Sequence, residues 1–212
     1  MTRHLLVLPG GGYHHHAPHE AEPIAEWIAG LGLATSIVRY PVQARHPAVL
    51  EAVRAAVRER RVAGAEQVGV IGFSAGGHAA GHAALSPGSP EERVDLAILG
   101  YPVVSMLLPT HAGSRKQLLG PHPSDALRAS TSLDLLVTPE APPFFLWHTA
   151  EDAAVPVQHS YLLGMALAAA GVPHALHVFP RGRHGLGLAR DEGDAARWTE
   201  LCAAWLREQG WL

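Results

Sequence analysis

The chain has 212 residues, of which 48% are hydrophobic, and its formal net charge is −3. This length suffices for one large domain with a two-sided core, so residues 1–212 are expected to form a single domain. The small negative charge argues against a nucleic-acid partner, as does the lack of basic residues interleaved with aromatic ones. The arginines that come nearest to a basic cluster fit one solvated helix face; they are Arg45, Arg54, Arg58, Arg60 and Arg61.

Targeting and redox signals point to the cytoplasm. No segment has the apolar length that a membrane crossing needs. Met1 leads directly into a strand-like pattern, without the charged start and cleavage site of a signal peptide. Cys202 is the only cysteine, so no internal disulfide can form and a reducing, cytoplasmic location is expected. Because Cys202 lies in an apolar helical pattern, we interpret it as a core residue rather than a catalytic one.

Strand-like and helix-like segments alternate along the chain. The strands are predicted from runs of Val, Ile, Leu and Phe, which are typical of a sheet covered on both faces. In chain order they span 4–8, 33–40, 67–73, 94–101, 143–148 and 174–179, with helices predicted at 20–31, 47–61, 75–85, 158–170 and 191–208. This alternation predicts a three-layer α/β/α sandwich with a parallel sheet and right-handed crossovers.

Residues 102–142 interrupt the alternation with several prolines and two short helical turns, near 114–119 and 123–129. We expect a long excursion from the domain rather than a second domain, and therefore no large helical cap. In an open parallel sheet the functional groups gather at the carboxyl ends of the strands. The loops that follow the strands are therefore where a site is expected.

A serine follows the third predicted strand in Gly72-Phe73-Ser74-Ala75-Gly76, which fits the pattern G-x-S-x-G. The flanking glycines allow a sharp, strained strand-to-helix turn that exposes the serine hydroxyl. The alternative is a glycine-rich helix start that binds phosphate, but the spacing of the known phosphate-binding loops is missing. We therefore interpret Ser74 as a nucleophile.

A serine nucleophile needs a base that takes its proton and a carboxylate that orients the base. His184 lies in a glycine-containing turn after the last predicted strand, and Asp152 follows the fifth. The chain order Ser, Asp, His is the order expected of an α/β-hydrolase. Glu151 is the alternative acid, although as a direct neighbour of Asp152 it is expected to point the other way.

Attack by the serine on a carbonyl also creates an oxyanion, which needs hydrogen-bond donors placed in advance. Glycines 10–12, after the first predicted strand, offer backbone N–H groups that no side chain obstructs. The N–H of Ala75, next to the serine, offers another. These two turns and the loops that carry the acid and the histidine share one edge of the predicted sheet.

Polar and aromatic residues crowd the same edge. The loop after the first strand contains His14, His15, His16, His19 and Glu20. Such groups suit zinc, but consecutive histidines do not readily converge on one ion and serine-dependent hydrolysis needs none. We therefore expect a polar rim of a substrate cleft, without metal or cofactor. Tyr13, His14 and Tyr101 are predicted to contact substrate, with Trp147 near them, whereas His78 and His82 are expected to pack locally.

Together, the segments PGGGY, GFSAGGH, YPVVS, FLWHTAEDAAVPVQHS and FPRGRHGLGL resemble the α/β-hydrolase superfamily, and within it compact bacterial esterases similar to acetyl xylan esterases. PGGGY looks like the HGGG-type loop of the hormone-sensitive-lipase branch, with Pro9 in place of the usual histidine. The resemblance covers nearly the whole chain. It implies Ser74 as nucleophile, Asp152 and His184 as its partners, and Gly11, Gly12 and Ala75 as oxyanion donors. Because the chain starts at the strand before the oxyanion loop, we expect six parallel strands in the order 2-1-3-4-5-6.

The resemblance also implies a carboxylic-ester substrate, often an acetyl group on a carbohydrate hydroxyl. We expect a serine hydrolase that cleaves short-chain esters through an acyl-enzyme intermediate, since a chain without a cap offers little apolar surface to a long acyl group. The alternatives are a non-catalytic small-ligand-binding protein and, within the same fold, a peptidase or thioesterase. The expected partner is a small-molecule ester rather than nucleic acid or membrane, and the chain is compatible with a homo-oligomer.

Overall fold

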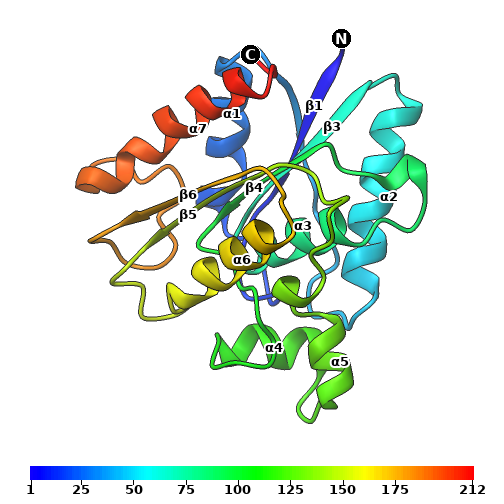
Figure 1. Cartoon of the computed structure of the whole chain (residues 1–212), viewed down its shortest axis with the longest axis vertical. Helices are drawn as coiled ribbons and strands as arrows, with labels where there is room; N and C mark the ends of the chain where they lie inside the picture. Colours follow the sequence, from blue (N-terminus) through cyan, green and yellow to red (C-terminus); the bar gives the residue numbers. More distant parts are fainter.

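The computed structural model describes all residues, 1–212. Its centre is one sheet of six strands in the order β2-β1-β3-β4-β5-β6, shown in Figure 1. The strands are β1 (Arg3–Leu8), β2 (Ala34–Ile37), β3 (Gln67–Phe73), β4 (Leu96–Gly100), β5 (Phe144–Thr149) and β6 (His174–Phe179). Every neighbouring pair of strands is parallel. The predicted fold class and strand order are both confirmed.

Helices cover both faces of the sheet. They are α1 (Glu22–Gly30), α2 (Ala48–Val62), α3 (Ala75–Leu85), α4 (Ala112–Leu119), α5 (Asp125–Ser130), α6 (Gln158–Ala169) and α7 (Trp198–Glu208). Short 3₁₀ helices lie at η1 (Pro18–Glu20), η2 (Pro90–Glu92), η3 (Leu133–Leu135) and η4 (Gly193–Arg197). Helices α1 and α7 cover one face, and α2, α3 and α6 cover the other (Figure 1).

The core is two-sided because successive side chains of a strand point to opposite faces. In β1, Leu5 and Val7 join a cluster of 21 buried residues under α1 and α7, whereas Leu6 and Leu8 join a cluster of 30 on the opposite face. Burial on both faces explains the apolar runs in the sequence. Cys202 is fully buried in the smaller cluster, as expected of a core residue, and burial raises the pKa of its thiol.

Most elements lie within two residues of their predicted ends, and two differ by more. The strand predicted at 33–40 contains only β2, because the partner strand β1 ends at Leu8 and the register pairs Val7 with Ile37. The helix predicted at 191–208 begins as the 3₁₀ helix η4 and becomes α-helical only at Trp198. Gly193 has a φ of +59°, which interrupts a continuous α-helix at that point.

The excursion predicted at 102–142 contains α4, α5 and η3, which lie together beside one end of the sheet in Figure 1. Leu118, Leu119 and Leu133 from this segment belong to the larger core cluster. The excursion is thus packed into the core of the sheet domain. It supplies one wall of the candidate site.

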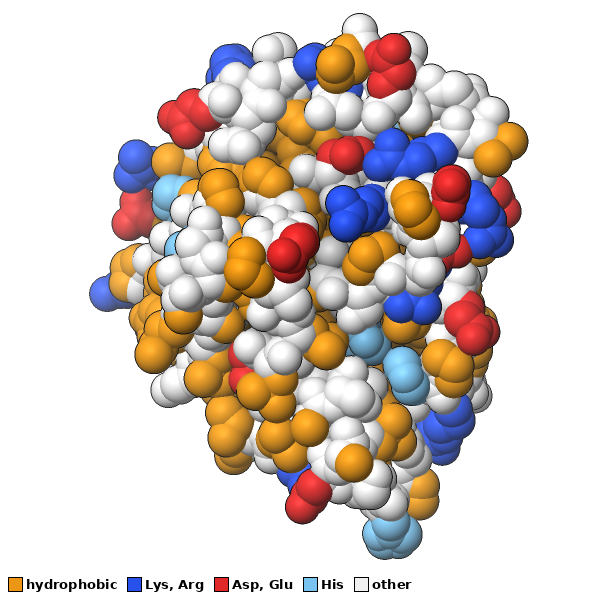
Figure 2. Space-filling model, turned by 45° about the vertical axis from the view of Figure 1, so that its right-hand side comes forward, with side chains coloured by type: hydrophobic (Ala, Val, Ile, Leu, Met, Phe, Trp, Pro, Cys, Tyr) orange, Lys and Arg blue, Asp and Glu red, His pale blue; other side chains and the backbone are white.

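The surface carries both signs of charge. On α2, Arg58 forms an ion pair with Glu92, and Arg61 forms one with Asp95 at 2.8 Å. On the face shown in Figure 2, basic and acidic side chains lie beside one another. The helices of the structure include none whose length and hydropathy would allow it to cross a membrane.

Trp198 offers a test of the packing beneath the site. Its buried ring stacks on Trp147 with centroids 5.0 Å apart, and its Nε1 donates to the Gly187 oxygen at 3.1 Å. Replacement by Ala leaves a cavity, so Trp198→Ala is expected to lower the free energy of unfolding by about 3–5 kcal/mol in urea titrations. Trp27→Ala, at a partly exposed ring, should lower it less. Equal losses would contradict this packing.

Candidate active site

The turn between β3 and α3 presents Ser74. Its backbone has φ +53° and ψ −119°, a conformation that a side-chain-bearing residue rarely adopts. The turn has no room for side chains on either side: a Cβ at Gly72 would lie 2.3 Å from the Gly76 oxygen, and one at Gly76 would lie 2.2 Å from the Leu8 oxygen. The two glycines of the G-x-S-x-G pattern therefore permit the strained turn.

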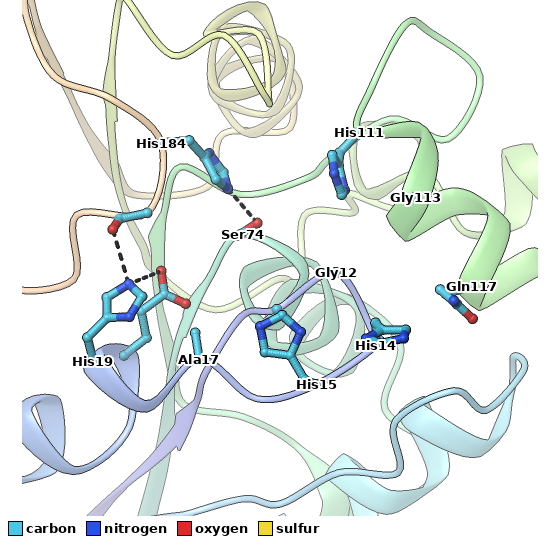
Figure 3. A pocket seen from close by; sticks show the side chains of 13 residues that line it. Gly12, His14, His15, Ala17, His19, Ser74, His111, Gly113, Gln117 and His184 are labelled. Carbon is cyan, nitrogen blue, oxygen red and sulfur yellow. Dashed lines mark hydrogen bonds and ion pairs between the residues drawn. The ribbon is translucent and has the colours of Figure 1, made fainter.

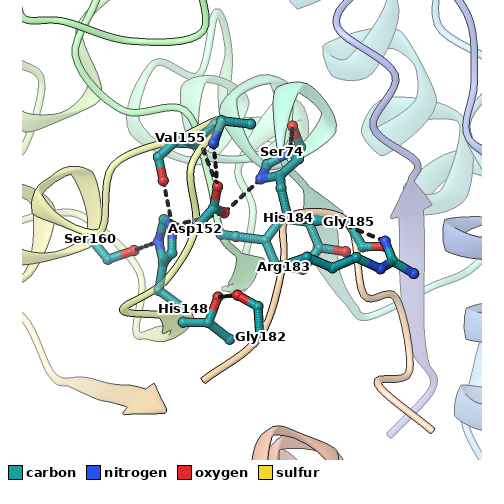
Figure 4. A network of polar contacts seen from close by, with 12 residues as sticks. Ser74, His148, Asp152, Val155, Ser160, Gly182, Arg183, His184 and Gly185 are labelled. Atoms are coloured by element: carbon teal, nitrogen blue, oxygen red, sulfur yellow. Dashed lines mark hydrogen bonds and ion pairs between the residues drawn. The ribbon is translucent and has the colours of Figure 1, made fainter. Parts of the chain in front are cut away.

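Ser74, His184 and Asp152 come together at the carboxyl edge of the sheet (Figure 4). Ser74 Oγ lies 2.8 Å from His184 Nε2, and His184 Nδ1 lies 2.6 Å from Asp152 Oδ2. Beside a carboxylate, Nδ1 carries the proton and donates, which leaves Nε2 of a neutral ring free to accept from the Ser74 hydroxyl. The structure thus brings together the three predicted catalytic side chains in the predicted order.

Asp152 lies in a dry, fully hydrogen-bonded site. Its Oδ1 accepts from the backbone N–H groups of Ala154 and Val155, each at 2.9 Å, while His148 Nε2 approaches Oδ2 at 3.3 Å. Burial acts to raise the pKa of Asp152, but hydrogen bonds from His148, His184 and the Val155 amide outweigh it and hold the pKa well below its ordinary value. The carboxyl group is therefore ionised where it faces His184.

Glu151, the alternative acid, points away from the histidine ring. Its side chain is exposed, and its Oε2 accepts a hydrogen bond from the Gly182 amide at 3.2 Å. The neighbouring carboxylates thus occupy opposite sides of the loop after β5. Only Asp152 contacts His184.

In the loop after β1, the backbone N–H groups of Gly11 and Gly12 have no hydrogen-bond partner. The Gly10 oxygen accepts from Ala17, and the Gly11 oxygen accepts from His14 and His15. In a trans peptide the N–H points opposite to the C=O, so the amides of Gly11 and Gly12 face away from these bonds. These two amides and that of Ala75 donate to no acceptor in the chain. Gly10 packs beside Ser74, since a Cβ there would lie 3.1 Å from Ser74 Cβ.

A cavity of about 470 Å³ opens in front of Ser74. Ser74 and Gly12 lie on one side of it, and His111 and Gln117 from the excursion lie on another (Figure 3). Gly11 also lines the cavity. Ala17 is the single hydrophobic residue among its 13 lining residues, and His14, His15, His19, His111 and His184 all line it. The cavity is therefore lined mainly by imidazole rings and glycine backbone, and it has few aliphatic side chains.

The residues predicted to contact substrate lie at different depths. His14 lines the cavity, whereas Tyr13 and Tyr101, like Trp147, are buried and do not line it. The Tyr13 hydroxyl bonds His78 Nδ1 at 2.6 Å, and the Tyr101 hydroxyl donates to Glu20 at 2.6 Å. Both tyrosines have positive φ, +62° and +37°, which turns their side chains inward from the strand ends.

The histidine-rich loop spreads its side chains rather than converging them. His14 and His15 line the cavity, whereas the His16 ring packs against Tyr40 with centroids 4.7 Å apart. No three His, Cys, Asp or Glu side chains are grouped as ligands of one metal ion. His78 bonds the Thr131 oxygen at 2.7 Å, and burial lowers its pKa to about 4.

Sequence reasoning missed three residues around the site. His111 and Gln117 come from the excursion. The sequence of its short helical turns does not predict which of their side chains lie next to the carboxyl edge of the sheet. His148 is fully buried, bonded to Ser160 Oγ at 2.7 Å and to the Val155 oxygen at 3.0 Å. A histidine inside an otherwise apolar strand was the signal that could have identified it.

Two curated proteins are similar to this chain in sequence. The chain is 38% identical over 210 residues to the endo-1,4-β-xylanase B of Butyrivibrio fibrisolvens. The matched region covers 89% of this chain and 33% of that protein. It is 29% identical over 201 residues to an acetylxylan esterase of Xylanibacter ruminicola, and this matched region covers 88% of this chain and 41% of that protein. The chain thus spans less than half the length of these curated relatives.

A solved structure matches over the whole chain. It is an acetyl ester-xyloside bifunctional hydrolase from Caldicellulosiruptor lactoaceticus, with 40% identity and a TM-score of 0.95, covering 100% of this chain and 85% of that one. Residues 43–210 match the model of the prolyl oligopeptidase family. Because this match spans most of the chain and the sheet has the strand order predicted for an α/β-hydrolase, the chain belongs to the prolyl oligopeptidase family within the α/β-hydrolase superfamily.

Proposed function

We propose that this chain is a serine esterase in which Ser74 is the nucleophile, His184 the general base and Asp152 the residue that orients His184. The observation that carries the proposal is the pair of hydrogen bonds from Ser74 Oγ through His184 to Asp152, at 2.8 and 2.6 Å, beside an accessible cavity. The predicted enzyme class, a carboxylic ester hydrolase, agrees with the acetylxylan esterase and the acetyl ester-xyloside hydrolase among its relatives.

The reaction follows from the geometry. Ser74 Oγ attacks the ester carbonyl while His184 Nε2 takes its proton, and His184 then protonates the leaving alcohol. The ionised Asp152 stabilises the imidazolium formed in between. The unpaired amides of Gly11, Gly12 and Ala75 are the proposed donors to the oxyanion. Water, activated by the same histidine, then hydrolyses the acyl group from Ser74.

The substrate that we propose is a small acyl ester, acetyl first, on a hydroxyl of a sugar or a similar polyol. With Ala17 as the one hydrophobic residue in its lining, the cavity offers few aliphatic side chains against which a long acyl chain could pack, and each methylene left unburied forfeits about 0.8 kcal/mol. Its imidazoles and the Gln117 amide suit the hydroxyls of a polar alcohol. The printed names of the relatives, acetylxylan esterase and acetyl ester-xyloside hydrolase, fit the same chemistry.

Glycoside cleavage is also named among the relatives, but the cavity does not favour it. Glycosidases of the usual kind need two carboxyl groups flanking the bond, about 5 to 9.5 Å apart. Glu20 is the single carboxylate in the lining, and both of its oxygens already accept hydrogen bonds from the protein. Asp152 lies behind His184. The site therefore favours ester attack by serine.

Covalent labelling tests the nucleophile. A fluorophosphonate probe should label the wild type once per chain, because Ser74 Oγ attacks its phosphorus and fluoride leaves. Ser74→Ala should abolish the label, detected by intact-mass spectrometry. Ser130→Ala removes an exposed serine and should label like the wild type. If the folded wild type stays unlabelled, or Ser74→Ala still reacts, the proposed mechanism is wrong.

Two neighbouring substitutions test the acid. Asp152→Asn removes the charge that fixes the His184 tautomer, so kcat is expected to fall roughly 10⁴-fold. Glu151→Gln keeps the shape of an exposed side chain and should leave kcat within about threefold of wild type, within the small effects typical of surface substitutions. The readout is steady-state hydrolysis of nitrophenyl acetate. The reverse pattern would move the role to Glu151.

A panel of nitrophenyl esters and acetylated sugars tests the substrate class. We expect kcat/KM to be highest for acetyl and to fall from butanoyl to octanoyl, and acetylated sugars to be deacetylated. Ser74→Ala, run in parallel, removes the background of spontaneous hydrolysis. Activity that rises steadily with chain length, while acetylated sugars stay intact, would show that the acyl group binds in an apolar slot instead.

A further inference from the structure

Glu20 is a buried carboxylate that the proposed mechanism does not use. It is 2% exposed, and its one ion-pair contact is with an imidazole rather than with a lysine or arginine. Its nearest basic neighbour is the half-exposed His19, whose Nε2 lies 3.7 Å from Glu20 Oε1 and bonds the Gly185 oxygen at 3.1 Å (Figure 3). An isolated buried carboxylate is costly unless hydrogen bonds compensate it. What compensates Glu20 is therefore informative.

Both oxygens of Glu20 accept hydrogen bonds from loops of the candidate site. Oε2 accepts from the Gly10 amide at 2.8 Å, and Oε1 accepts from the Tyr101 hydroxyl at 2.6 Å. That hydroxyl in turn accepts from the Gly187 amide at 2.8 Å. Every partner of the carboxyl group is a donor, so the ionised acceptor satisfies all of them. An amide in its place would turn N–H groups toward a donor.

The contacts connect the Glu20 carboxylate both to a proposed oxyanion donor and to the proposed general base. Gly10 shares a peptide with Gly11, whose amide is a proposed oxyanion donor, and Gly187 follows His184 in the same turn. The Tyr101 ring also packs edge-on against the His184 ring, with centroids 5.1 Å apart. Glu20 thus joins the loops after β1, β4 and β6, which no backbone hydrogen bond connects to one another in this way.

We propose that Glu20 is a positioning residue: through Gly10 and through Tyr101–Gly187, it holds the Gly11 amide and the His184 ring at a fixed separation around the reacting carbonyl. This role rests on the serine-esterase function proposed above. Oxyanion donors act only when placed before charge develops, and a shift of about 1 Å in such a group can cost about 100-fold in rate. Glu20 therefore acts on the transition state more than on substrate binding.

Steady-state kinetics on titrated active sites test this role. Glu20→Gln should lower kcat by on the order of 100-fold with KM changed less than about threefold. A trifluoromethyl ketone adds to Ser74 Oγ and leaves an oxyanion, so its Ki should rise by about the factor by which kcat/KM falls. Tyr101→Phe keeps the ring against His184 and the Glu20–Gly10 bond, and should lose less, about tenfold.

A second buried carboxylate serves as the matched control. Glu92 is 8% exposed, pairs with Arg58 and accepts from the Gly88 amide, far from the cavity. Glu92→Gln should lower the unfolding midpoint without changing kcat per titrated site. If Glu20→Gln behaves in the same way, with kcat and the ketone Ki unchanged, Glu20 is merely structural and the proposal is overturned.

Amide hydrogen exchange tests the hydrogen bonds from Glu20 to Gly10 and, through Tyr101, to Gly187, independently of activity. In Glu20→Gln the Gly10 and Gly187 amides should both exchange faster, whereas Tyr101→Phe should release only Gly187. Unchanged protection of the Gly10 amide in Glu20→Gln would refute the proposal that Glu20 holds these loops together. Failure of the fluorophosphonate to label wild-type Ser74 would instead refute the serine-esterase proposal and, with it, the catalytic consequence assigned to Glu20.

Discussion

Ser74 occupies a backbone conformation, φ +53° and ψ −119°, that persists only where the surrounding structure enforces it. Its amide donates to Gly100 in β4, and its carbonyl accepts from His78 and Val103. The turn exists because Gly72 and Gly76 let β3, α3 and the end of β1 approach within contact of one another. The position of the hydroxyl, and with it the cavity, the histidine and the acid, depends on this turn.

Around the turn, the side chains of the proposed triad differ in their exposure to solvent. The Asp152 side chain is fully buried, and that of His184 is 25% exposed where it meets the cavity. His148 lies behind Asp152 and bonds Ser160, so the carboxylate is held from both sides. The proposed activation of Ser74 requires a fixed, ionised acid behind a histidine that solvent can reach. The three-layer sandwich provides this arrangement by burying one end of the network.

The Ser74 turn, the helix behind it and the strand-end loops that carry Asp152 and His184 could be predicted from the sequence, but the other side chains that line the cavity could not. The span predicted for the helix after Ser74 matches α3, because small residues and a glycine turn mark both the turn and the helix behind it. Tyr13 and Tyr101 were placed in the cleft, yet their positive φ values and buried partners turn them inward. His111 and Gln117 enter the cavity from an excursion whose path depends on long-range packing of Leu118 and Leu133.

In the proposed mechanism, the Ser74 hydroxyl attacks a carbonyl whose oxygen is received by the amides of Gly11, Gly12 and Ala75. A crystal structure of the protein after reaction with a nitrophenyl alkylphosphonate would show both contacts in one adduct. We expect phosphorus bonded to Ser74 Oγ, with the phosphoryl oxygen about 2.7–3.1 Å from at least two of these amides and the His184–Asp152 contact retained. An adduct whose phosphoryl oxygen points away from all three amides, or a phosphonate on another residue, would contradict it.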